Sequence, residues 1–230
     1  MIARRSILSG FSAVAAARPL EALAATRCLQ QAAWGYRTCE TGVEHGLVET
    51  ARQECDSWCW AACIQTIFAV HGRAVSQEQV SRRLFGSDRC QGANIEQIIG
   101  VISGNWVTAN SVPFRASARL LPRASLAVQI SGGSNDNRPA GYMDKAWAAA
   151  GDTRELIGEL DAGRPLINLA VGHATVLTSV TYQRNELLQA GPAPIIKLVV
   201  RDPWKDNANR RELTVREVQG MFFVVAVSVS

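Results

Sequence analysis

Four residues of this chain have the types and the spacing that cysteine-based acyl transfer needs. Cys59 lies in an apolar, helix-like stretch, His173 opens a strand-like run far downstream, and Asp202 precedes Pro203. A thiol attacks a carbonyl as its thiolate, and an imidazole oriented by a carboxylate stabilises that form. Gln53, six residues before Cys59, carries a carboxamide N–H that could meet an oxyanion together with the Cys59 backbone N–H. The sequence therefore predicts Cys59 as nucleophile, His173 as base, Asp202 as orienter and Gln53 as oxyanion donor.

The nucleophile is expected at a helix N-terminus. Asp56 or Ser57 is the candidate N-cap, apolar residues follow at helical spacing, and Gly72 ends the pattern. In a first helical turn, exposed N–H groups and the helix dipole favour a thiolate. Plainer alternatives exist for each assignment: a buried core cysteine, a core histidine with satisfied ring nitrogens, and an aspartate that only shapes a turn before proline.

The other two histidines fit the role of base less well. His45 precedes the cysteine motif in a glycine-flanked segment, which we expect to be a loop. His71 closes the Cys59 helix about three turns from the thiol. We expect His71 to be a cation that complements the helix dipole.

This set of residues resembles the papain-like cysteine peptidases, most closely the compact bacterial branch in which Trp-Cys-Trp-Ala-Ala opens the helix. Gln53, Cys59 and Trp60 match the family's Gln, its Cys six residues later and the Trp that follows. His173 matches the family's His before a hydrophobic strand. The resemblance implies that Trp60 packs beside the nucleophile or contacts substrate.

The third catalytic position of that family matches Asp202, which is followed two residues later by Trp204. Papain itself has Asn at this position, whereas the smaller bacterial relatives commonly use Asp. The resemblance implies that Trp204 shields the hydrogen bond between His173 and Asp202 from water.

The resemblance also implies a fold and an activity. The fold would be α+β, with a helical N-terminal half packed on an antiparallel sheet half and the active-site cleft between them. The activity would be hydrolysis of peptide or related amide bonds in a peptide or protein, through a thioester and without a metal or organic cofactor. Two rivals stay open: a catalytically silent exported binding or inhibitor module, and a cysteine-dependent amidase or transglutaminase-type acyl transferase.

Local patterns agree with an α+β class. Helices are predicted at residues 76–86, 94–104 and 152–163, and strands at residues 166–171, 174–182, 195–201 and 222–229. Residues 131–139 are polar and turn-rich, so we expect a loop, with a mobile flap as the functional alternative. Pocket-lining residues are expected from residues 105–150, where no motif is matched.

All six cysteines follow residue 25. If the nucleophile stays reduced, the simplest pairing joins Cys28 to Cys39 and Cys55 to Cys90, and leaves Cys63 as a buried free thiol. The second link would tie the approach to the catalytic helix to a later loop, much as a disulfide does in papain-like enzymes. Sequence alone does not determine connectivity, so other pairings stay open.

The first 25 residues have the features of an export signal. Arg4 and Arg5 precede a weakly apolar stretch, and small residues at 22–24 form a cleavage site. The arginine pair resembles a twin-arginine signal, with a Sec signal as the alternative. The chain is therefore divided into a signal peptide, residues 1–25, and one peptidase-like domain, residues 26–230, that is periplasmic or secreted. The apolar stretch is too short to span a bilayer, so no membrane attachment is expected after signal removal.

Charge and motif content narrow the partner classes. Removal of residues 1–25 takes away three arginines and one glutamate, which lowers the formal net charge from +4 to +2. A net charge this small does not indicate binding to nucleic acid. The cysteines at positions 55, 59 and 63 lack the close pairing of zinc ligands, so no metal site is expected. A monomer is the expected oligomeric state, although the sequence does not determine it.

Overall fold

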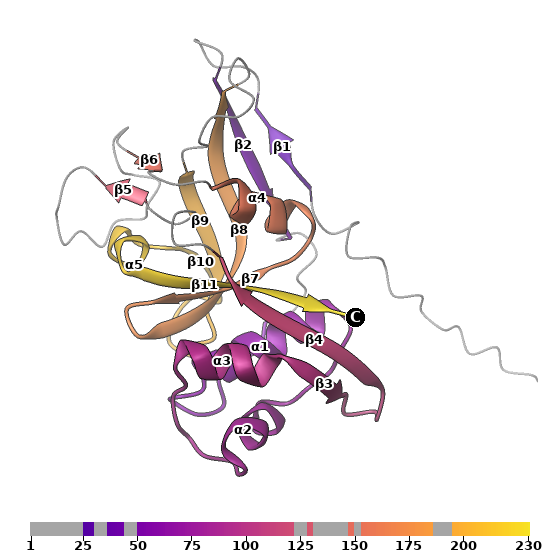
Figure 1. The fold of residues 1–230 in the computed structure, drawn as a ribbon. Helices are drawn as coiled ribbons and strands as arrows, with labels where there is room; N and C mark the ends of the chain where they lie inside the picture. The colour runs from indigo at the N-terminus through magenta and orange to yellow at the C-terminus, as the bar shows by residue number, and fades with distance from the viewer. Residues whose placement is uncertain are drawn as a thin grey trace, which may run out of the picture.

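The computed structural model describes residues 25–29, 36–43, 50–121, 128–130, 147–149, 153–185 and 195–230. Within these residues the chain combines one large antiparallel sheet with five helices (Figure 1), so the predicted α+β class is confirmed. None of the described helices is long and apolar enough to cross a membrane. The predicted signal up to residue 24 and the predicted loop at 131–139 lie outside the described residues.

The helices are α1 (Cys59–Val70), α2 (Gln77–Phe85), α3 (Ile95–Ile102), α4 (Arg154–Asp161) and α5 (Val215–Gln219). Ser76 and Asn94 cap α2 and α3 as predicted, because each side chain accepts a hydrogen bond from a backbone N–H in the first turn. The predicted caps of α1, Asp56 and Ser57, are wrong: Trp58 is its N-cap, without a side-chain cap. A helix that lacks a side-chain cap leaves its first N–H groups available to other acceptors.

Nine of the described strands form the large sheet. The strands are β1 (Arg27–Cys28), β2 (Tyr36–Gly42), β3 (Gly104–Val107), β4 (Pro113–Leu120), β7 (Leu166–Ala170), β8 (His173–Asn185), β9 (Ile195–Arg201), β10 (Arg210–Glu212) and β11 (Met221–Val229). Their order is β1–β2–β8–β7–β11–β4–β3, and β9 pairs with both β8 and β10. Strands β5 (Val128–Ile130) and β6 (Trp147–Ala149) form a separate pair.

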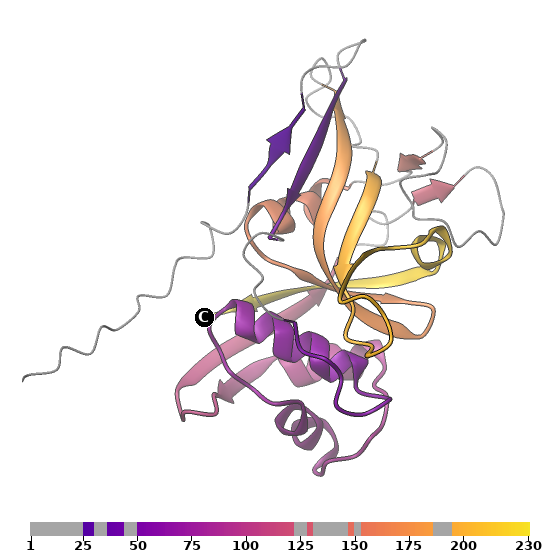
Figure 2. The same cartoon turned by 180° about the vertical axis from the view of Figure 1, so that it is seen from behind.

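The sheet separates two apolar cores. Successive side chains of a strand point to opposite faces, and in β11 Val225 and Val227 join one core whereas Val224 and Ala226 join the other. Helices α1, α2 and α3 cover the first face, and α4 and α5 supply the second core. Seen from behind, α1 runs beneath the sheet (Figure 2). Strands buried on both faces read as continuous apolar runs, which explains why β7, β9 and β11 were predictable.

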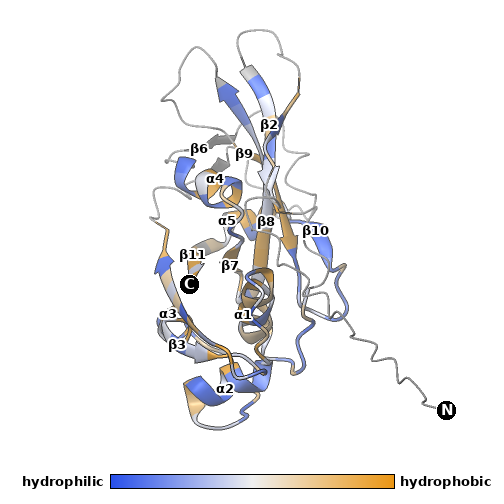
Figure 3. Cartoon of the chain, turned by 90° about the vertical axis from the view of Figure 1, so that its right-hand side faces the viewer, coloured by the Kyte–Doolittle hydropathy of each residue, from blue (hydrophilic) through white to orange (hydrophobic). Residues whose placement is uncertain are grey.

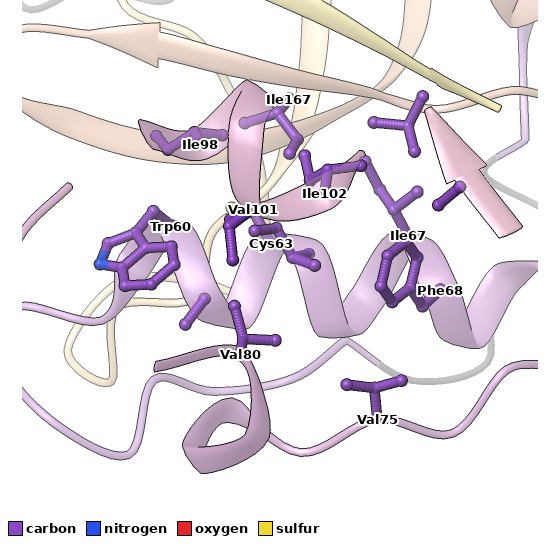
Figure 4. Close-up of a cluster of buried hydrophobic side chains, with 14 of the residues drawn as sticks. Trp60, Cys63, Ile67, Phe68, Val75, Val80, Ile98, Val101, Ile102 and Ile167 are labelled. Atoms are coloured by element: carbon purple, nitrogen blue, oxygen red, sulfur yellow. The ribbon is translucent and has the colours of Figure 1, made fainter. Parts of the chain in front are cut away.

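The first core forms around α1. Its side chains Trp60, Cys63, Ile67 and Phe68 gather with residues of α3 and with Ile167 of β7 (Figure 4). Apolar residues concentrate where α1 lies against β8, whereas α2 and β10 are largely polar (Figure 3). This core fixes the axis of α1 against the sheet, so the first residue of α1 is held near the start of β8.

The N-terminal half is less helical than predicted. Strand β2 pairs with β8, and β4 pairs with β11 and β3, so both halves of the chain contribute to one sheet. In β4 only Phe114 and Ala116 are buried, between exposed polar residues. Strands of such mixed polarity are set by their neighbours in the sheet more than by their own propensity. The division into a helical half and a sheet half is therefore corrected.

Two disulfides match the simplest predicted pairing. Cys28 and Cys39 join β1 to β2, and Cys55 and Cys90 join the approach to α1 to the loop before α3. Cys63 is a fully buried free thiol, as predicted. The second disulfide fastens the segment that leads into Cys59.

Candidate active site

Cys59 is the first residue of α1, and its thiol is partly exposed. The backbone N–H groups of Trp60 and Ala174 and the imidazole of His173 lie within hydrogen-bonding reach of the sulfur. Burial raises the pKa of Cys59, but the hydrogen bond to His173, its charge and the two N–H donors outweigh burial and lower the pKa below 9.0. The helix N-terminus acts in the same direction. The surroundings of Cys59 therefore favour the thiolate.

The turn before Cys59 is held by the loop that contains the disulfide-bonded Cys90. The backbone N–H of Trp58 donates to the carbonyl of Cys55 at 3.0 Å. Its indole N–H donates to the Arg89 carbonyl at 2.6 Å, and the indole N–H of Trp60 donates to the Gln91 carbonyl at 3.1 Å. These bonds fix the helix start in place of a side-chain cap.

His173 is the first residue of β8 and follows a two-residue hairpin turn. Val171 and Gly172 form this turn with φ values of 51° and 77°, and Ala170 pairs with His173 across it. Positive φ at both positions matches the twist of the flanking strands. The imidazole Nε2 lies 2.8 Å from Oδ1 of Asp202, so Nδ1 is the ring nitrogen left to face the thiol.

The ionisation of His173 complements that of Cys59. Burial lowers the pKa of His173, but hydrogen bonds and charge interactions with Asp202 and Cys59 raise it from 6.5 to about 9. The proton is therefore favoured on the imidazole and disfavoured on the thiol. Near neutral pH His173 is therefore an imidazolium, and the thiol beside it ionises more readily than an ordinary cysteine.

Asp202 follows β9 and is fully buried. Its Oδ1 faces His173 and accepts the Trp204 backbone N–H at 2.9 Å, and its Oδ2 accepts the Asn207 amide N–H at 2.9 Å and Arg211 Nε–H at 2.8 Å. Burial raises the pKa of Asp202, but the hydrogen bonds and the charge of His173 hold it well below 3.8. Asp202 is therefore a carboxylate that is fixed in orientation.

The carboxamide of Gln53 is bound to the turn before α1. Its Nε2 donates to the carbonyls of Cys55 and Asp56 at 3.0 and 2.9 Å, which uses both amide hydrogens. Its Oε1 is buried without a hydrogen-bond partner. The observed role of the carboxamide is to brace the turn before α1, and the predicted oxyanion role would require it to rotate.

The two tryptophans named from the sequence differ in exposure. Trp60 is 1% exposed and packs in the first core, with its ring 6.1 Å from Phe85 in a T-shaped contact. Trp204 is partly exposed, and its ring stands at 89° to the imidazole of His173 with centroids 6.5 Å apart. Trp204 thus lies against the imidazole that Asp202 orients.

A cavity of about 540 Å³ opens beside the thiol. Its walls are the start of α1, residues 92–95, the β7–β8 hairpin, Trp204 and Phe223 of β11. Both Cys59 and His173 line it. None of residues 105–121 does, so this described part of the 105–150 region does not supply the expected lining.

Sequence reasoning missed two arginines that support Asp202. Arg52 Nη1 donates to the backbone carbonyls of Asp202, Trp204 and Asn207 at 3.2, 2.6 and 3.0 Å, and so ties the approach of α1 to the Asp202 loop. Arg211 reaches the same carboxylate from β10. In the sequence both resemble ordinary solvated charges, and only the pairing of β10 with β9 brings Arg211 back to Asp202.

His71 differs from its predicted role. It is the C-cap of α1, but burial and the positive charges of Arg164 and Arg73 lower its pKa below 6.5. Its Nε2 is buried without a hydrogen-bond partner. His71 is therefore neutral near neutral pH and not the expected cation, and His45 lies outside the described residues.

Cys63 is the second free cysteine in the described part of the chain. Cys63 is fully buried, and burial together with the charges of Cys59 and Asp202 raises its pKa well above 9.0. Among the described residues, no group of three or more His, Cys, Asp or Glu side chains could hold a metal ion.

In comparisons with known proteins, no protein-family model matches the sequence and no curated protein matches it significantly.

Proposed function

We propose that this chain is an exported papain-like cysteine peptidase that hydrolyses peptide or related amide bonds. The observation that carries the proposal is one continuous set of contacts: the Cys59 thiol and the His173 imidazole lie within hydrogen-bonding reach in the wall of one cavity, and His173 Nε2 lies 2.8 Å from Asp202 Oδ1. A nucleophile at a helix start, a base at a strand start and a carboxylate after the next strand support the papain-like arrangement.

The charges on these groups suit acyl transfer. The Cys59 thiolate attacks the substrate carbonyl carbon and forms the C–S bond, and the oxyanion accepts the Cys59 backbone N–H at the uncapped helix start. His173 gives its Nδ1 proton to the leaving amine as the C–N bond breaks, which leaves a thioester. His173 then takes a proton from water, which attacks the thioester and releases the acid and the thiolate.

Asp202 and Trp204 support this cycle through His173. Asp202 stabilises the imidazolium and keeps Nδ1 toward the thiol, and Trp204 limits access of water to that ion pair. Gln53 stays a predicted second oxyanion donor, which requires its N–H groups to leave the carbonyls of Cys55 and Asp56.

The cavity and the disulfides support the rest of the proposal. A space of about 540 Å³ with both reactive side chains in its wall suits one segment of a polypeptide substrate. Two disulfides are typical of chains that mature outside the reducing cytosol. They agree with the twin-arginine-like signal at the N-terminus.

Labelling of the folded protein with an epoxide-based thiol-peptidase inhibitor tests the proposal. We expect one adduct, mapped by mass spectrometry to Cys59, which is lost in Cys59→Ala, strongly reduced in His173→Ala and kept in the matched control Cys63→Ala. A peptide-library digest then distinguishes the reaction: new peptide termini support hydrolysis, whereas amine incorporation without new termini supports the acyl-transferase alternative. A folded protein without any adduct contradicts the proposal.

A further inference from the structure

Arg211 contacts the carboxylate of Asp202 on the side opposite to the imidazole. Its Nε lies 2.8 Å and its Nη2 lies 2.7 Å from Oδ2, whereas Oδ1 faces His173. Arg211 lies on β10. The pairing of β10 with β9 brings it close to Asp202, the residue that follows β9. The carboxylate therefore bridges a guanidinium and an imidazole, one on each oxygen.

Each N–H group of the Arg211 guanidinium has an acceptor. Besides the two contacts to Asp202, Nη1 donates to Glu217 Oε2 at 2.8 Å and to the Glu212 carbonyl at 3.3 Å, and Nη2 donates to Glu217 Oε1 at 2.5 Å. The Arg211 side chain is only 19% exposed. A planar fork held at all its donors can take one position only, and a lysine ammonium cannot reproduce it.

Glu217 is fixed in turn by the capping box of α5. Its Oε2 accepts the Thr214 backbone N–H at 2.8 Å, and the Thr214 hydroxyl accepts the Glu217 backbone N–H. Charged hydrogen bonds thus run without a break from α5 through Arg211 and Asp202 to His173. The signs alternate along this series, with the thiolate at its end.

Other charged or titratable groups surround the series. On α1 these are the thiols of Cys59 and Cys63, the second of which stays protonated because burial raises its pKa. Before α1, Arg52 binds backbone carbonyls of the Asp202 loop. At the rim, Lys205 and Asp56 form an exposed ion pair at 3.8 Å. Among the groups placed by these contacts, Arg211 and Glu217 are the partly buried charges behind Asp202: Arg211 contacts its carboxylate, and Glu217 contacts Arg211.

We propose that Arg211 and Glu217 form a positioning pair, in which Arg211 holds Oδ1 of Asp202 toward His173 and Glu217 balances the charge of Arg211. The inference rests on the proposed function, because it assigns a task to residues behind that site. Neither residue touches substrate. Their effect reaches Cys59 through Asp202 and His173 only.

Opposite charges predict opposite effects on the imidazole. Without the positive charge of Arg211, the negative charge of Asp202 is unopposed, so the pKa of His173 rises. Without the negative charge of Glu217, the guanidinium is unopposed, so the pKa of His173 falls. For unit charges separated by one carboxylate at an effective dielectric constant near 20, each change should be on the order of one pH unit. Loss of structure alone would not produce shifts of opposite sign.

Nuclear magnetic resonance titration of the histidine rings tests the inference without a substrate. The chain has three histidines, and His173→Gln assigns the relevant signal. We expect His173 to titrate near 9 in the parent protein, about one unit higher in Arg211→Gln, about one unit lower in Glu217→Gln, and near the parent value in the double variant. Arg211→Lys keeps the charge and should stay closer to the parent value than Arg211→Gln.

The inference is overturned if both single variants move the titration in the same direction, or if neither moves it by more than a few tenths of a unit. Should Arg211→Gln fail to fold, the other two variants still decide the question. Glu217→Gln should lower the pKa of His173, and the charge-balanced double variant should restore it. The proposed function fails differently: the parent protein itself would then show an ordinary His173 titration and no adduct at Cys59.

Discussion

The substitution Asp202→Asn removes the charge that keeps His173 protonated and leaves a side chain of the same shape. The pKa of His173 is raised from 6.5 to about 9, in spite of burial, by hydrogen bonds and charges from Asp202 and Cys59. This difference corresponds to roughly 3 kcal/mol between the two protonation states. The hydrogen bond to Asp202 is the largest of the raising influences, so the substitution should remove more than half of the increase.

We therefore expect His173 in Asp202→Asn to lose its proton at or below about pH 7.5, well before the parent protein does. The effect passes to the thiol with the opposite sign. A weaker imidazolium stabilises the thiolate less, so the pKa of Cys59 rises toward its ordinary 9.0. The pH window in which thiolate and imidazolium coexist narrows from both sides.

The rate of Cys59 alkylation by iodoacetamide, followed by mass spectrometry across pH, measures both changes. In the parent protein the rate should rise once as the thiol ionises and again near 9 as His173 loses its proton. In Asp202→Asn the two steps should converge, with a lower alkylation rate at a pH between the two steps of the parent.

Asn207→Ala is the matched control, because it removes a hydrogen bond of 2.9 Å to Asp202 Oδ2 but no charge. In this variant the second rise of the alkylation rate, which reports the loss of the His173 proton, should stay near the pH of the parent protein. An upper step that remains near 9 in Asp202→Asn refutes the assignment of Asp202 as the group that sets the His173 pKa. Circular dichroism must show both variants folded, since Asp202→Asn leaves buried Arg211 facing a neutral group.

Three further perturbations follow from the same geometry. Replacement of Cys55 and Cys90 by serine opens a 35-residue loop and should lower the free energy of unfolding by roughly 3 to 4 kcal/mol in a denaturant titration; an unchanged midpoint would contradict the structural role of this disulfide. Gln53→Ala should lower thermal stability by about 1 to 3 kcal/mol through two lost hydrogen bonds, whereas a loss of two to three orders of magnitude in kcat at unchanged stability would restore its oxyanion role. Trp204→Ala should admit water to the ion pair and so move the pKa of His173 away from about 9, with Trp204→Phe closer to the parent; equal titrations in all three proteins would remove the shielding role.

Residue types and spacing were enough to find the parts of the site that local chemistry specifies. A cysteine at a helix start, a histidine at a strand start and an aspartate before a proline all depend on short segments with strong signals. The two disulfides match the simplest pairing predicted with Cys59 kept reduced, although the sequence left other pairings open. The capping boxes of α3 and α5 show that helix starts are also specified by short sequence segments. Of these two, only the start of α3 was predicted.

The missed features depend on pairing between distant segments. Strand β4 is polar along one face and became a strand through its register with β11 and β3. Arg211 carries no local sign of its contact with Asp202, because the β9–β10 register alone sets it. Gln53 had the right type and spacing for an oxyanion donor, yet the carbonyls of Cys55 and Asp56 compete for its N–H groups. Sequence spacing gives reach but not the direction in which a side chain points.

The central claim is that His173, which holds its proton up to a pH of about 9, lowers the pKa of the Cys59 thiol below its ordinary value. The ultraviolet difference absorbance of the thiolate, measured as the parent protein minus Cys59→Ala across pH, tests this claim most directly. We expect the signal to appear at a pH below the ordinary thiol value of 9.0 and to move to higher pH in His173→Ala. A signal that first appears near 9.0 in the parent protein, unchanged by His173→Ala, would contradict the account.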